Sequence, residues 1–171
     1  MSAPHPEEGT VPVTRVELRR VGAADLVRRD EELRRSEFAR SLSEQSLERI
    51  LQGATGKRFV HQASVYREGD GCRGLYLVLR GEIRFWGRSA AEQVDFGGAL
   101  RGELFGEDAI DSTARPYSAV AQGAEVDVLE LPSATVREVL GREPSLQRLL
   151  QGLRTRREAA RQEMCDFLGR W

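Results

Sequence analysis

The stretch that decides the fold covers residues 66–83 and reads YREGDGCRGLYLVLRGEI. The leucines at every second position from Leu75 to Leu79 supply one apolar face of a strand. Gly69 and Gly81 stand where tight turns require a positive φ. We therefore expect two strands, over 74–79 and 82–86, joined by a turn at Gly81.

The same pattern continues on both sides of this stretch. Short runs of β-branched and aromatic residues are separated by turns that contain glycine, and such spacing is typical of a barrel or a jelly roll. The further strands are expected over 57–60, 64–66, 93–96, 117–121 and 126–131, with turns at 68–71, 97–98 and 122–123.

Helical periodicity flanks the predicted strands. A helix is expected from Phe38 to Leu51, with Ser43 as a plausible N-cap and a stop near Gly53 or Gly56. Ser133 can cap a short helix that follows the last strand. Pro144 then opens a long C-terminal helix at its first turn, where a missing N–H costs nothing.

The long C-terminal helix carries two interleaved series with a spacing of seven, which is the pattern of a coiled-coil seam. Arg157 and Gly152 weaken the pattern. Either the helix packs on its own barrel, or it self-associates as a homodimer, and the length of the stripe favours the second interpretation. The predicted dimer seam consists of Leu146, Leu150, Leu153, Ala160, Met164, Phe167 and Trp171.

The chain divides into three parts. Residues 1–35 form an N-terminal arm that is dense in charge and poor in apolar residues, so we expect a flexible segment or a docking helix. Residues 36–143 hold the first helix and the β-barrel, and residues 144–171 form the self-associating helix.

Composition excludes several classes of protein. The 171 residues carry a net charge of −1, distributed as +1 over 1–60, −5 over 61–143 and +3 over 144–171, and the acidic middle is a poor surface for nucleic acid. No run is long and apolar enough for a membrane span, and no secretory leader is expected. Two distant cysteines and two histidines argue against a metal site and for a reducing cytoplasm. Arginine supplies 25 of the 26 basic residues, which suggests a GC-rich, bacterial genome.

Two motifs together resemble the cyclic-nucleotide-binding domain family. The first is the stretch 66–83, and the second is Leu104-Phe105-Gly106-Glu107, which is similar to the opening of the family's phosphate-binding cassette. The resemblance covers about residues 36–165. It implies a mainly β fold, an eight-stranded jelly-roll β-barrel with flanking helices and a long C-terminal helix. Regulators that resemble the catabolite activator protein add a DNA-binding helix-turn-helix, and we expect none here and no direct DNA binding.

The resemblance also assigns roles within the cassette. It implies that Glu107 binds the ribose hydroxyl and that an arginine, in a Pro-Arg-Ser-Ala or Pro-Arg-Ala-Ala context, binds the cyclic phosphate. Here that context reads Pro116-Tyr117-Ser118-Ala119, so Tyr117 replaces the arginine, while Arg115 stands two residues earlier. Asp108 and Asp111 would repel a phosphate, and Arg115 either swings in to replace the missing cation or is only a surface residue. The candidate ligand-binding residues of this degenerate cassette are Gly106, Glu107, Arg115, Tyr117 and Ser118.

The sequence therefore predicts a regulatory or scaffold protein that is not an enzyme. It is expected to act through protein–protein contacts, as a homodimer with another protein partner, and to need no cofactor and no metal. The alternative is a true sensor of cyclic AMP, cyclic GMP or another small anion that signals through its helices. Losing one charge-assisted bond and adding a nearby carboxylate would cost about 3 kcal/mol, which is about a hundredfold in nucleotide affinity.

Overall fold

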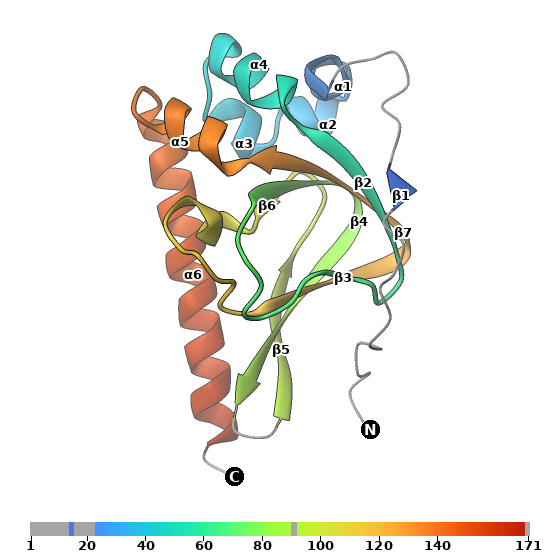
Figure 1. The fold of residues 1–171 in the computed structure, drawn as a ribbon, viewed down its shortest axis with the longest axis vertical. Helices are drawn as coiled ribbons and strands as arrows, with labels where there is room; N and C mark the ends of the chain where they lie inside the picture. Colours follow the sequence, from blue (N-terminus) through green and yellow to red (C-terminus); the bar gives the residue numbers. More distant parts are fainter. Residues whose placement is uncertain (1–13, 16–22, 90–91, 170–171) are drawn as a thin grey trace.

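The computed structural model describes residues 14–15, 23–89 and 92–169 of the chain. Within this part, seven strands form one antiparallel sheet in the order β1-β2-β7-β4-β5, with β3 paired to β7 and β6 paired to β4. Helices flank the sheet, and the mainly β architecture is confirmed (Figure 1). The strands are β1 (Thr14–Arg15), β2 (Thr55–Val60), β3 (Ser64–Tyr66), β4 (Gly74–Ser89), β5 (Glu92–Ala99), β6 (Leu104–Phe105) and β7 (Ser118–Pro132).

Three glycine positions that the sequence marks as turns lie inside strands instead. β4 and β7 run straight through Gly81 and Gly123, and β5 runs through Gly97. The pairing of β4 with β7 shifts its register on both sides of Arg80, so Gly81 belongs to a bulge. At Gly81 φ is +83°, and an added Cβ would lie 2.8 Å from the Val126 side chain. The described sheet accordingly has seven strands instead of the expected eight. In the described residues, no pairing between β1 and β5 closes the sheet into a barrel.

The N-terminal helices are shorter than expected. The helix predicted from Phe38 to Leu51 is two helices, because Ser36 and Ser43 each accept a hydrogen bond from a backbone N–H and start a new one. The Ser43 cap and the stop at Gly53 are confirmed. Ser133 does not cap its helix, since its hydroxyl donates to the Arg73 carbonyl. The helices are α1 (Ala23–Arg29), α2 (Glu31–Arg34), α3 (Glu37–Arg40), α4 (Glu44–Gln52), α5 (Ser133–Leu140) and α6 (Pro144–Leu168), with a short 3₁₀ helix η1 (Glu107–Ile110).

The core has two parts, and α6 contacts both of them. The first part lies among the helices and one end of the sheet, and it includes Ala23, Val27 and Leu33 from the described portion of the N-terminal arm. The second part lies within the fold of the sheet and is rich in aromatic residues. In Figure 1, α6 runs along one side of the molecule from the helical end to the β4–β5 hairpin.

The two halves of α6 have different surroundings. Leu146, Leu150 and Leu153 are buried in the first core of the same chain, so this part of the predicted seam is not available to a second copy. Ala160 and Met164 are half-buried against the second core. Phe167, in contrast, is 56% exposed, and Trp171 lies outside the described residues.

Candidate ligand cassette

The cassette begins where β6 ends. Gly106 follows Phe105 with φ +75°, and an added Cβ would lie 3.0 Å from Nη1 of Arg115 and 3.1 Å from the Tyr76 ring. A side chain at this position is therefore both strained and crowded. The glycine turns the chain into η1, which carries Glu107 and Asp108 in its first turn.

The Glu107 carboxylate is bound from within the chain. Its exposed fraction is 1%, and Arg157 of α6 forms an ion pair with it. Arg157 is itself 8% exposed, donates to the Leu104 carbonyl at 2.6 Å, and lies over the Phe85 ring at 4.8 Å. Two opposite charges thus satisfy each other in an apolar setting, where a lone charge would be costly.

Tyr117 completes the surroundings of Glu107. Its side chain is buried between the rings of Phe85 and Phe96, at centroid distances of 5.2 and 4.9 Å. Its hydroxyl lies 3.4 Å from Oε1 of Glu107 and donates to it. Burial, followed by the negative charge of Glu107, raises the pKa of Tyr117, so the hydroxyl keeps its proton and remains a donor.

Arg115 is a cassette residue with an exposed fraction of 2%, so the surface alternative is wrong. It donates to the carbonyls of Gly106 at 2.8 Å and Gly74 at 2.6 Å, and its guanidinium lies over the Tyr66 ring at 4.1 Å. The side chain therefore ties η1 to the start of β4. Among the described residues, its Nε has no hydrogen-bond partner, and the same holds for the Tyr66 hydroxyl and Oδ2 of Asp108.

The two aspartates of the cassette differ in their electrostatics. Burial, with the adjacent Glu107 charge, raises the pKa of Asp108 from 3.8 to about 6. Asp111 lies near the surface, and its hydrogen bonds with Arg154 lower its pKa. The expected repulsion of an anion is therefore reduced at Asp111, because Arg154 neutralises it.

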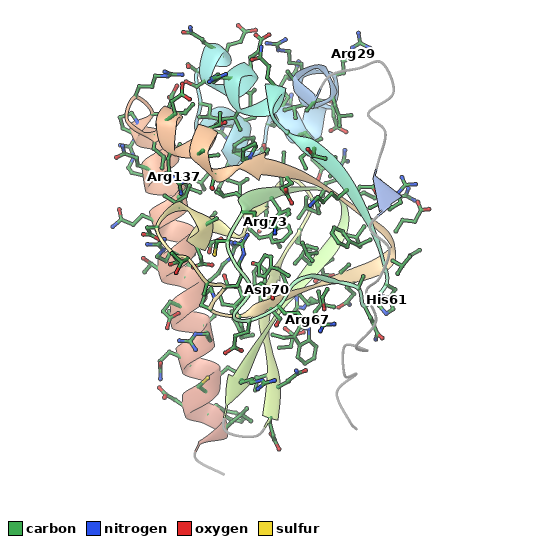
Figure 2. All side chains as sticks on the ribbon, in the orientation of Figure 1. Arg29, His61, Arg67, Asp70, Arg73 and Arg137 are labelled. Atoms are coloured by element: carbon green, nitrogen blue, oxygen red, sulfur yellow. The ribbon has the colours of Figure 1, made fainter. Side chains whose placement is uncertain are left out.

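Further contacts hold the cassette to its neighbours. Arg137 of α5, labelled in Figure 2, donates to the carbonyls of Ala109 at 3.1 Å and Ile110 at 3.3 Å. Ser118 serves a different turn, since its hydroxyl accepts from the Glu68 N–H at 2.9 Å. The structure thus brings Gly106, Glu107, Arg115 and Tyr117 together, whereas Ser118 binds the turn before β4.

Sequence reasoning missed the role of Arg154 and Arg157. They stand three residues apart on α6, so they share one face of the helix, and both bind carboxylates of the cassette. The available signal was Arg157 itself, a charged residue in the middle of an apolar stripe. From the sequence alone it reads as a weakness of the seam, because its partner lies fifty residues away in the chain.

The family model described as cyclic nucleotide-binding domain matches residues 57–143, which is more than half of the chain. The chain belongs to this family. The match includes η1 and most of the cassette contacts, and it ends just before α6. No curated protein sequence matches the chain.

Solved structures show the same fold. The sensor domain of the transcriptional regulator DNR from Pseudomonas aeruginosa aligns with a TM-score of 0.64 and 18% identity, over 74% of this chain and 86% of that one. Catabolite activator protein from Thermus thermophilus aligns with a TM-score of 0.60 and 23% identity, over 81% of this chain and 63% of that one. The regulatory domain of Toxoplasma gondii PKA, solved with cAMP, gives a TM-score of 0.61 at 16% identity, over 80% and 50%.

The described residues lack two features that other classes of function require. None of their helices is long and apolar enough to cross a membrane. No three or more of their His, Cys, Asp and Glu side chains are grouped so that they could hold a metal ion.

Proposed function

We propose that the chain is a non-enzymatic regulatory or scaffold protein whose cassette is degenerate for cyclic nucleotide and which acts through protein–protein contacts. The ion pair between Arg157 and Glu107 carries this proposal. In this pair, a side chain of the protein itself binds the Glu107 carboxylate, to which the family resemblance assigns a ribose hydroxyl as partner. A nucleotide that displaced Arg157 from this carboxylate would leave a buried charge without its partner, which costs about 3–5 kcal/mol.

The cassette also offers little to a phosphate. Tyr117 stands at the position of the family's arginine and is a neutral donor that already bonds Glu107. Arg115 already donates two hydrogen bonds to backbone carbonyls. An entering anion would therefore have to compete with bonds that the protein already makes.

The proposed partners are proteins. The exposed Phe167 near the end of α6 supports a homodimer through the C-terminal half of this helix, and a further partner protein would receive the signal. Both cysteines, Cys72 and Cys165, are free thiols, which fits a reducing cytoplasm. The proposal includes no cofactor and no direct contact with DNA.

A true sensor of cyclic AMP, cyclic GMP or another small anion is the second candidate. Arg115 favours it, because its guanidinium lies inside the cassette with an unpartnered Nε in the described structure. Such a ligand would accept a hydrogen bond from this Nε and would signal through α6, since Arg157 links that helix to Glu107.

Calorimetry separates the two candidates. Cyclic AMP and cyclic GMP are titrated into the wild type, with 5′-AMP as the control ligand, and we expect no saturable heat from any of the three. The same titrations on Arg115→Ala and Arg115→Lys, each checked for folding by its thermal transition, show whether this side chain matters. Micromolar binding of a cyclic nucleotide by the wild type, lost in Arg115→Ala, would establish the sensor instead.

A further inference from the structure

We propose that the groove between α3 and the N-terminal half of α6 binds a short acidic segment of a partner protein that carries an apolar side chain at its centre. The inference rests on the proposed function and deepens it, because it names the surface and the chemistry of the partner. The groove has a volume of about 830 Å³. A second groove of about 950 Å³, between α2, α3 and the loop before β6, continues from it and shares Glu37, Leu149 and Arg156.

Three exposed arginines give the first groove its charge. Arg40 reaches it from α3, and Arg148 and Arg156 reach it from α6. Arg148 donates to the Ser145 hydroxyl at 3.1 Å, and Arg156 donates to the Gly152 carbonyl at 3.4 Å. Within the part of the chain that the structure describes, none of the three forms an ion pair, and Glu37 is the one carboxylate of the lining.

In the described residues, three arginines without an ion pair are gathered in the first groove. Among the other described arginines, some are paired with a carboxylate, for example in Arg58–Asp127, Arg84–Asp95 and Arg101–Asp30, and others, such as Arg29 and Arg88, form no ion pair. Three guanidinium groups that lack carboxylates and line one groove therefore leave a local excess of positive charge. An acidic segment would supply the carboxylates that this groove lacks, in the bidentate geometry that arginine favours.

The floor of the groove provides the apolar contact. Leu149 is half-buried at the junction of the two grooves. Gly152 lies one turn further along α6, and an added Cβ there would find no atom within 4 Å, so the space above the helix is open. An apolar side chain of the partner can therefore reach Leu149 while flanking carboxylates reach Arg148 and Arg156.

The second groove argues for a protein segment over nucleic acid. Its lining holds five carboxylates and four arginines, for a net charge of −1, and Arg35 and Arg101 form ion pairs with Asp30, Glu31 and Glu32. A phosphate backbone that continued along the surface would pass from the arginines of the first groove onto a lining with no excess of positive charge. A short acidic segment of a protein can place its charges on the first groove alone.

Fluorescence anisotropy on the full chain tests the proposal. The probe is a fluorescein-labelled peptide of glutamates that flank a central pair of leucines, and the comparison probes are the matching lysine–leucine peptide and a short DNA duplex. We expect the acidic peptide to bind at low salt and to weaken at about 0.3 M salt. Arg40→Glu, Arg148→Glu and Arg156→Glu should each weaken it by about tenfold. Arg88→Glu, an equal change of charge on the exposed end of β4, should leave binding unaltered.

Each other result overturns the proposal. No binding of the acidic peptide at low salt excludes the site, and so does binding that Arg88→Glu weakens as much as the groove variants do. Tighter binding of the DNA duplex that the same groove variants abolish would make this a nucleic-acid surface. Calorimetry with cyclic nucleotides decides the proposed function separately, so a failure of the groove and a failure of the proposed function give different results.

Discussion

Arg157→Met should destabilise the protein far more than a neighbouring arginine substitution. The change removes the ion pair with Glu107 and the bond to the Leu104 carbonyl, and it leaves a carboxylate that is 1% exposed without its cation. Removing one partner of a buried pair costs about 3–5 kcal/mol. For a domain of this size that is about 6–20 °C in the thermal midpoint.

Arg154→Met is the matched control. It lies on the same face of the same helix and loses the same kind of partner, but the side chains of Arg154 and Asp111 are 42% and 52% exposed. An exposed ion pair contributes about 0–1 kcal/mol. Urea denaturation of both variants beside the wild type measures the difference in the free energy of unfolding.

The double variant Arg157→Met with Glu107→Gln tests the cause. Removing both charges avoids the unpaired carboxylate, so we expect the double variant to recover most of the stability that Arg157→Met loses. The reasoning is refuted if Arg157→Met and Arg154→Met are equally stable. It is also refuted if the losses in the free energy of unfolding caused by the changes at 157 and 107 are additive in the double variant.

Two further predictions concern pH and assembly. Because the pKa of Asp108 is raised from 3.8 to about 6, the folded state binds more protons than the unfolded state between these values, and stability should fall as pH rises from about 4 to about 7. The loss should be about 1–3 kcal/mol, and a pH series of urea denaturation should become flatter in Asp108→Asn; an unchanged slope would exclude this assignment. Phe167→Glu should shift the sedimentation mass from dimer to monomer without loss of folding, whereas Leu153→Glu should unfold the chain, since Leu153 lies in its own core; a monomeric wild type would exclude the dimer.

The sheet was largely predictable, because strand alternation is a local property. Residues 74–79 and 82–86 alternate as strands should, and they do lie in β4. The same sequence could not distinguish a turn from a bulge at Gly81, since both need a glycine with positive φ. Pairing with β7 decides between them, and that pairing depends on residues forty or more positions away.

The site was predictable only in part, for a related reason. The cassette motif located Gly106 and Glu107 correctly, because the motif is contiguous. Its departure at Tyr117 was visible too. The place of the Arg115 guanidinium was not, because a long side chain two residues out of register can still reach the cassette from its own position. The contact of Arg157 with Glu107 was harder to predict, since helical spacing identifies neighbours along α6 but not the residues that the helix packs against.

The ion pairs of the cassette have a consequence for any signal that passes through it. Glu107 is neutralised by Arg157 and Asp111 by Arg154, and both arginines belong to α6. A molecule that displaced Arg157 from the Glu107 carboxylate would therefore also release part of the contact between α6 and the rest of the fold. Binding of such a molecule at the cassette is therefore coupled to the position of α6. The affinity of the molecule would be reduced by the free energy needed to release the helix. In the structure Arg157 forms this ion pair and also donates to the Leu104 carbonyl, so the arginine itself ties α6 to the cassette.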